Sequence, residues 1–186
     1  MELVFASRNQ HKLLEIQAML PKGITLKLPS DFGIHEDIPE TADTLKGNAF
    51  LKATYIFEKT GLNCFADDSG LEVEALDNAP GVYSARYAGE QKNNSDNIDL
   101  LLKNIELSTN RNASFKTVIC LIINGNAHYF EGEVKGKIID KKRGTSGFGY
   151  DPVFMPDGFN TTFGEMTADE KNNISHRKQA IKKMAL

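Results

Sequence analysis

The segment 7–12 carries side chains that suit an anion. Ser7 and Asn9 can donate hydrogen bonds, and Lys12 lies one turn into a predicted helix. The N-terminus of a helix presents backbone N–H groups and the positive end of a dipole, which suits phosphate. The GxxxxGK[ST] pattern of a P-loop is absent. The segment therefore predicts either a phosphate site of another kind or a plain helix cap with a solvated lysine.

Two adjacent acids, Asp67 and Asp68, follow an apolar run in a segment predicted to end a strand in a turn. Such acids are costly to bury unless they are hydrogen-bonded, solvated or bound to a metal. Successive strand residues point to opposite faces, so one acid can face a ligand while the other anchors the turn. The spacing is not that of an EF-hand, and it fits Mg²⁺ held by one or two carboxylates plus substrate phosphates. An acidic turn without a ligand is the alternative.

Two later segments also carry residue types that a core does not need. In the glycine-rich loop 144–152, Phe148 and Tyr150 flank Gly149 and could stack on a base. His176 and Arg177 are adjacent donors at a predicted helix start and could hold carbonyl oxygens or phosphate. The alternatives are a flexible loop with one aromatic ring in the core, and a solvated basic helix end.

The first part of the chain predicts alternating strands and helices that would position these groups. Apolar spacing and stop residues give a strand at 2–6, a helix from 13 to 20, a strand at 24–28, an exposed connection at 29–43, and a helix at 44–59 that ends at Gly61. The inner face of this last helix is predicted to include Leu51.

The remainder predicts one more helix, a long hairpin and two C-terminal helices. A strand is predicted at 63–66 and runs into Asp67-Asp68-Ser69-Gly70, after which 71–76 can be extended again. Asn94-Ser95 offers a cap for a helix whose apolar face runs to Leu107. Strands at 114–123 and 127–139 flank Asn124-Gly125, a strong hairpin signal. Thr167 opens a capping box, and Ser175 can cap a final helix through Met184.

This order predicts an α/β fold built on a central twisted mixed sheet with helices on both faces. The 186 residues fit one domain, 1–186, and the 40% hydrophobic content supports a buried core. The net charge of −3 disfavours nucleic-acid binding. No apolar run is long enough for a membrane span, and no basic segment precedes an apolar one as in a signal peptide, so the expected location is cytoplasmic.

Both cysteines, Cys64 and Cys120, lie in apolar strand-like segments and are predicted to be buried thiols rather than zinc ligands.

Taken together, these segments resemble the inosine/xanthosine triphosphate pyrophosphatase family, over almost the whole chain and in the family's order. The resembling stretches are Ser7-x-Asn9-x-x-Lys12, Glu40-Thr41 with Asn48-Ala-x-x-Lys52-Ala53, Ala66-Asp-Asp-Ser-Gly-Leu71, Pro80-Gly-Val-Tyr-Ser-Ala-Arg-Tyr-Ala-Gly89, Gly147-Phe-Gly-Tyr-Asp-Pro152 and Glu170-Lys-x-x-Ile-Ser-His-Arg177. One departure is Arg8, which stands where the family often has glycine.

The resemblance implies an elongated fold with two lobes around a nucleotide cleft, and a homodimer. It implies Mg²⁺-dependent hydrolysis of the non-standard purine nucleotides ITP, dITP and XTP to the monophosphate and pyrophosphate. Asp68 would be the general base and, with Glu40, a metal-side carboxylate. The phosphates would be held by Ser7, Asn9, Lys12 and Lys52, with Ser69 beside them. Phe148 would stack on the purine, and the base and sugar pocket would be lined by Gly149, Tyr150, Asp151, Lys171, His176 and Arg177.

The choice of base would follow from hydrogen bonding. Hypoxanthine and xanthine carry a 6-keto oxygen where adenine has an amino group. Donors such as Arg177 with His176 would reward the keto group and would be left unpaired by adenine.

The sequence is also compatible with three other functions. One is a related pyrophosphatase that acts on modified pyrimidine or methylated nucleotides. Another is a catalytically silent nucleotide sensor, and the third is a nucleic-acid-binding module. Retention of both Glu40 and Asp68 argues against the sensor.

Overall fold

The computed structural model describes residues 1–184. The strands are β1 (Glu2–Phe5), β2 (Thr25–Lys27), β3 (Cys64–Val73), β4 (Asn112–Ile123), β5 (Asn126–Ile138) and β6 (Phe154–Pro156). The α-helices are α1 (Gln10–Met19), α2 (Leu45–Thr60), α3 (Asn94–Asn104), α4 (Ala168–Ile174) and α5 (His176–Met184), and short 3₁₀ helices lie at Pro29–Phe32, Glu74–Leu76, Gly81–Arg86 and Asp151–Val153. The predicted α/β order is confirmed.

Local signals account for most helix boundaries. The Thr44 side chain accepts from the Gly47 N–H at the start of α2, and Gly61 ends this helix in the left-handed conformation that glycine adopts without strain. Thr167 and Glu170 form the predicted capping box of α4. The two-residue turn Asn124-Gly125 joins β4 and β5, with positive φ at both residues.

Four details of the sequence prediction are wrong. Asn93 rather than Asn94-Ser95 caps α3, because the Asn93 side chain accepts from the Asp96 N–H. The helix ends at Asn104, so Leu107 lies outside it and is exposed, and Leu51 on α2 is likewise exposed rather than on the inner face. Asp67 and Asp68 lie within β3, not in a turn after it, because the strand continues to Val73.

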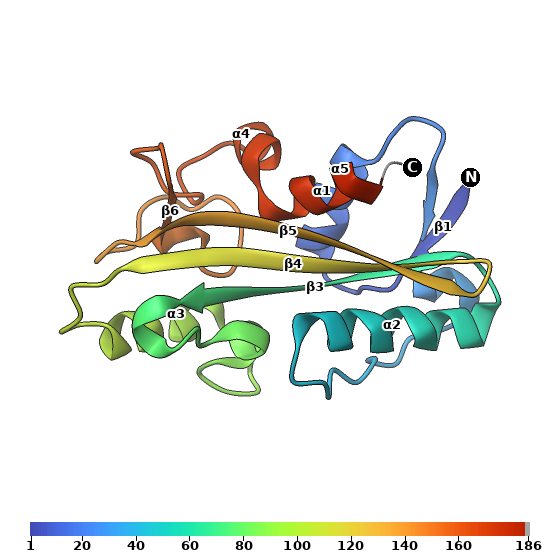
Figure 1. Ribbon diagram of the computed structural model, residues 1–186, viewed down its shortest axis with the longest axis horizontal. Coiled ribbons are helices and arrows are strands. Elements are labelled where there is room, and N and C mark those ends of the chain that lie inside the picture. The colour runs from blue at the N-terminus through green and yellow to red at the C-terminus, as the bar shows by residue number, and fades with distance from the viewer. Residues whose placement is uncertain (185–186) are drawn as a thin grey trace. The chain divides into compact units, whose positions relative to one another are not determined.

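The sheet is mixed, with the strand order β2-β1-β3-β4-β5-β6. β1 pairs in parallel with β2 and with β3, whereas β5 pairs antiparallel with β6. Figure 1 shows the long strands β3, β4 and β5 running beside one another. The predicted central mixed sheet is confirmed.

The chain divides into two compact units. Among the described residues, unit one comprises 1–68, 117–132 and 177–184, and unit two comprises 69–116 and 133–176. Strands β3, β4 and β5 each contribute residues to both units. The chain therefore changes unit between Asp68 and Ser69, and again between His176 and Arg177.

In unit one, alternate strand residues face two helical layers. Leu3, Phe5 and Phe65 pack with α1 and α5, while Val4, Cys64 and Ala66 pack with α2. Figure 1 shows α2 on one face of these strands and α1 and α5 on the other. The period-2 alternation of a strand thus buries both of its faces. Helices on both faces are what the sequence predicted.

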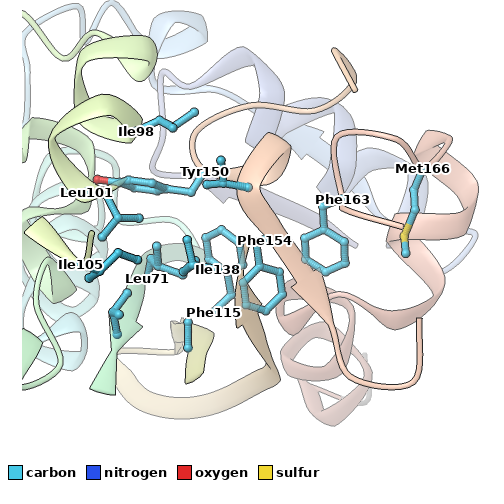
Figure 2. Packing of buried hydrophobic residues seen from close by; sticks show 13 residues of the cluster. Leu71, Ile98, Leu101, Ile105, Phe115, Ile138, Tyr150, Phe154, Phe163 and Met166 are labelled. Carbon is cyan, nitrogen blue, oxygen red and sulfur yellow. The ribbon is translucent and has the colours of Figure 1, made fainter. Parts of the chain in front are cut away.

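Unit two has a core rich in aromatic rings. Phe154 packs against Phe115 and Phe163, with ring centroids 4.7 Å and 5.2 Å away. Figure 2 shows this group together with Tyr150 beside Leu101 of α3. This packing fixes the segment that follows the loop 144–151.

Cys64 and Cys120 are buried in unit one, as predicted. Within residues 1–184, no helix is both long enough and apolar enough to span a membrane.

Candidate active site

In unit one, Lys52 connects Glu40 and Asp68, the two carboxylates that were predicted to hold a metal. The Lys52 Nζ atom lies 2.5 Å from Glu40 Oε1 and 3.3 Å from Asp68 Oδ1. Lys52 projects from α2, Asp68 from β3, and Glu40 from the connection before α2. Lys52 and Asp68 are both buried. Residues 40, 52 and 68, far apart in sequence, therefore meet at one point.

Burial sets the protonation of this cluster. It raises the pKa of Asp68 above the ordinary value of 3.8, against the opposing effect of the Lys52 charge. Burial alone would lower the pKa of Lys52, but the Asp68 and Glu40 charges raise it above its ordinary value. Asp68 is thus more basic than an ordinary aspartate, while Lys52 stays charged.

The other acid, Asp67, anchors a second cluster in unit one. Its Oδ2 atom lies 3.0 Å from Lys12 Nζ and accepts a bond from Arg177 Nε at 3.3 Å. Glu15 of α1 also pairs with Arg177. Burial alone would raise the pKa of Asp67, but Lys12 and Arg177 hold it well below its ordinary value. Asp67 is therefore ionised and fixes two basic side chains.

The surroundings of Arg177 differ from those predicted from the sequence. The sequence predicts an open donor at a helix start, but the side chain is 1% exposed and is paired with two carboxylates. The sequence shows that Glu15 follows Lys12 by one turn of α1 and shares its face, but it carries no signal for the pairing with Arg177, which lies 162 positions away. Glu15 and Asp67 were not among the predicted site residues.

The segment 7–9 leads into α1, and Asn9 caps this helix. The Asn9 side-chain oxygen accepts from the Lys12 N–H, and Ser7 Oγ accepts from the Asn9 N–H. Both bonds use oxygen as the acceptor, so the Ser7 hydroxyl proton and the Asn9 amide protons can serve an anion. A cavity of about 290 Å³ borders both residues. The Arg8 side chain pairs with Asp37 at the surface, 2.8 Å away.

A third cluster lies in unit two around the loop 144–151. The Lys171 Nζ atom is 2.6 Å from Asp151 Oδ2 and 4.8 Å from the centre of the Phe148 ring. Asp151 Oδ2 also accepts from the Phe148 N–H, at 2.9 Å. Gly147 has positive φ, and a Cβ there would lie 2.0 Å from the same oxygen. The loop is thus shaped around Asp151, and it holds the half-buried Phe148 beside a cation.

Two other predicted site residues of unit two, Tyr150 and His176, contact the protein core. Tyr150 is buried in the core, and its hydroxyl donates to the Ser84 carbonyl at 2.8 Å. The His176 ring stacks on Phe115, with centroids 5.1 Å apart. Gly149 and Ser69 are both half-buried. Because Tyr150 is buried in the core, its position does not support the predicted stacking of its ring on a base.

The donor set of the first cluster fits a divalent cation. Glu40 and Asp68 offer carboxylate oxygens to the same ammonium group, and Mg²⁺ is commonly held by one or two carboxylates plus substrate phosphates. Residues 1–184 contain no group of three His, Cys, Asp or Glu side chains that could form a cage by itself. A metal here would therefore need further ligands from a substrate.

Comparison with known proteins agrees with this chemistry. Residues 3–186 match the Ham1 family. A dITP/XTP pyrophosphatase of Flavobacterium psychrophilum is 58% identical over 182 residues, which cover 98% of this chain and 96% of that protein. The dITP/XTP pyrophosphatase of Flavobacterium johnsoniae is 55% identical over 184 residues, covering 99% and 96%.

Two solved structures share the fold. A HAM1 protein from Coxiella burnetii superposes with a TM-score of 0.92 at 39% identity, covering 100% of this chain and 96% of that one. A nucleoside-triphosphatase / dITP/XTP pyrophosphatase from Mycobacterium abscessus gives a TM-score of 0.82 at 39% identity, covering 99% and 98%.

Proposed function

This chain belongs to the Ham1 family, and we propose that it is a dITP/XTP pyrophosphatase, which hydrolyses ITP, dITP and XTP to the nucleoside monophosphate and pyrophosphate. The observation that carries the proposal is the meeting of Glu40, Lys52 and Asp68 at one buried point. A lysine and a cation held by the two carboxylates would neutralise the triphosphate, and a carboxylate would place the hydrolytic water.

The basic groups of unit one suit the triphosphate. Lys12 and Lys52 each carry an ammonium group beside a carboxylate, and Ser7 and Asn9 add neutral donors at the start of α1. Ser69 follows Asp68 directly and is proposed to bind beside them. Breaking the bond between the α and β phosphates develops charge on the pyrophosphate, which these donors would stabilise.

Asp68 is proposed as the general base. Its carboxylate accepts a proton from the attacking water as the oxygen bonds to phosphorus, and the pyrophosphate leaves with the electrons of the broken P–O bond. A base works best when its pKa lies near the working pH. The raised pKa of the buried Asp68 moves it in that direction.

Glu40 and Asp68 would also hold Mg²⁺. When bound, the ion supplies charge neutralisation and polarises the phosphate oxygens. Lys52 contacts both of these carboxylates, so its ammonium group would lie close to the metal and to the phosphates that it is proposed to bind.

The cluster of unit two suits a purine. Phe148 offers a half-buried ring for stacking, and Asp151, Lys171 and the backbone of Gly149 offer polar groups next to it. His176 and Arg177 are proposed, from the family resemblance, to favour the 6-keto edge. Because Arg177 balances Asp67 and Glu15, its replacement by alanine would lower stability together with specificity.

Two further proposals rest on the family resemblance. The chain acts as one domain, and it works as a homodimer. The molar mass in solution, measured by light scattering at several protein concentrations, tests the second: a mass near 20.6 kDa would contradict it.

The test is pyrophosphate release from ITP, XTP, dITP, dTTP and ATP, side by side, with and without Mg²⁺. We expect release from the first three only, and only with the metal. Fastest release from dTTP would favour the pyrimidine alternative. Tight binding of ITP without release would favour a nucleotide sensor and would contradict the proposed reaction.

A further inference from the structure

Asn48 is a buried polar residue on α2 that none of the roles above uses. It is 1% exposed, and both ends of its amide group are hydrogen-bonded. The Nδ2 atom donates to Asp68 Oδ2 at 3.2 Å, and the Oδ1 atom accepts from the Ala42 N–H at 2.9 Å. One side chain thus contacts the proposed base and the segment that carries Glu40.

The segment before α2 is also packed closely against the first turn of the helix. A Cβ at Gly47 would lie 2.6 Å from the Ala42 Cβ and 3.0 Å from Thr44 Oγ1. Glycine at this position therefore lets the segment approach, and the bond to Asn48 fixes it there. Ala42 is two residues from Glu40, so this contact limits where the Glu40 carboxylate can lie.

Asp68 receives two different donors. Its Oδ1 atom faces Lys52 Nζ at 3.3 Å, and its Oδ2 atom accepts from Asn48. Lysine is a flexible point charge, whereas the amide is short and bonded at its other end. Of these two contacts, the Asn48 bond is the more directional restraint on the rotation of the carboxyl group. A precise orientation matters because a misplacement of about 1 Å can cost ~100-fold in rate.

We propose that Asn48 is a positioning residue, which orients the Asp68 carboxylate and sets its separation from Glu40 before substrate binds. The role rests on the proposed function, since it acts through the proposed base. The asparagine is suited to it because one amide supplies the donor that a carboxylate needs and the acceptor that a backbone N–H needs.

Unit two contains a matched control residue. Asn97 is the fourth residue after the cap of α3, as Asn48 is after the cap of α2. It is 2% exposed, its Oδ1 atom accepts from the Ala88 N–H at 2.7 Å, and its Nδ2 atom donates to the Ala85 carbonyl at 3.0 Å. The two asparagines therefore tie a preceding segment to a helix in the same way, but only Asn48 contacts a proposed catalytic group.

The experiment compares Asn48→Ala with Asn97→Ala in steady-state ITP hydrolysis. Asn48→Ala is expected to lower kcat by about 10- to 100-fold, the usual effect of removing a partner of a ligating group, with a much smaller change in KM. Asn97→Ala is expected to keep the wild-type kcat, although both variants lose melting temperature. Equal kcat values in the two variants would overturn the proposal.

Amide hydrogen exchange supplies a readout that is independent of turnover. The Ala42 amide should exchange faster in Asn48→Ala and not in Asn97→Ala, while Ala88 should show the reverse. An unchanged Ala42 amide would refute the link to the segment of Glu40. If wild-type protein hydrolyses no nucleotide, the proposed function fails, and this measurement still decides the link.

Asn48→Asp covers the case in which Asn48→Ala does not fold. Aspartate keeps the acceptor for the Ala42 N–H but places a carboxyl oxygen where the donor to Asp68 was. Slow Ala42 exchange together with a reduced kcat would support the proposal. A wild-type kcat in the folded variant would show that the donor to Asp68 has no positioning role.

Discussion

Asp68 is the residue on which the proposed chemistry depends most. Replacing it by asparagine keeps the shape but removes the charge and the basicity. We expect Asp68→Asn to lower kcat for ITP by about 10²- to 10⁴-fold, the usual range for loss of a general base. Steady-state kinetics at saturating Mg²⁺ measures this. A variant that keeps more than about a tenth of the wild-type kcat would refute the assignment, provided that its melting temperature shows a folded protein.

Lys52 separates the two carboxylates that would bind the metal. Removing its ammonium group in Lys52→Met takes away the cation that Glu40 and Asp68 share. The variant should therefore bind Mn²⁺ more tightly than wild-type protein in the absence of nucleotide. It should also bind a triphosphate more weakly, by about 1.5–3 kcal/mol for one charge-assisted hydrogen bond.

Calorimetry with Mn²⁺ alone, and with ITP and inosine compared, measures both effects of Lys52→Met. Lys46→Met is the control, since Lys46 lies exposed on the same helix and contacts the Tyr129 ring. If Lys52→Met binds Mn²⁺ more weakly than wild-type protein, or loses equal affinity for ITP and for inosine, Lys52 does not lie beside both the metal and the phosphates.

At the scale of elements, the loop 144–151 depends on a glycine. Gly147→Ala would push the Asp151 carboxylate away from the Phe148 N–H and from Lys171. We expect kcat/KM for ITP to fall by about 10- to 100-fold, because the stacking ring is misplaced. Most of the change should appear in KM, since Asp68 and its partners belong to unit one.

Gly158→Ala is the matched control for this loop. Gly158 also has positive φ, but a Cβ there would meet no atom within 4 Å. It therefore reports the strain of the backbone alone. If both variants lower kcat/KM equally, the contact with Asp151 is not the cause.

The boundaries of elements show where local signals suffice. The cap at Thr44, the stop at Gly61 and the turn at Asn124-Gly125 were predicted because each depends on residues within a few positions. The extent of β3 was not, because two adjacent acids resemble the end of a strand. Strand structure continues through them since Lys12, Arg177 and Lys52 from three helices balance their charge.

At the scale of the whole molecule, folding keeps two thiols protonated. Burial raises the pKa of Cys64 from 9.0 to about 12 and that of Cys120 from 9.0 to about 11. The unfolded chain therefore releases these protons at lower pH than the folded protein. The stabilising contribution is complete below pH 9 and is lost as pH rises through 11 and 12.

Chemical denaturation between pH 8 and 11 tests this dependence. Each thiol should contribute a loss of up to about 1.4 kcal/mol per pH unit above its unfolded pKa. Cys64→Ala and Cys120→Ala should each reduce the slope, although both lower stability at neutral pH. A slope that both substitutions leave unchanged would show that the thiols do not titrate on unfolding.

The sequence alone determined the chemistry and the succession of elements. The lysines, the acidic pair and the glycine-rich loop were recognised as candidate site residues from short motifs in the sequence. The same motifs, in the same order, carried the family resemblance. The interleaving of strands with helices likewise predicted a sheet with helices on both faces, and the apolar residues of β1 and β3 do pack on both sides.

Only the tertiary structure decided how the charges are paired. Asp67 and Asp68 are neighbours with the same side chain, yet one is held ionised by Lys12 and Arg177 while burial makes the other more basic. Arg177 lies 110 positions from Asp67 in sequence. Which carboxylate is held ionised and which becomes more basic depends on long-range packing, because the energy of a buried charge is set by the groups that surround it.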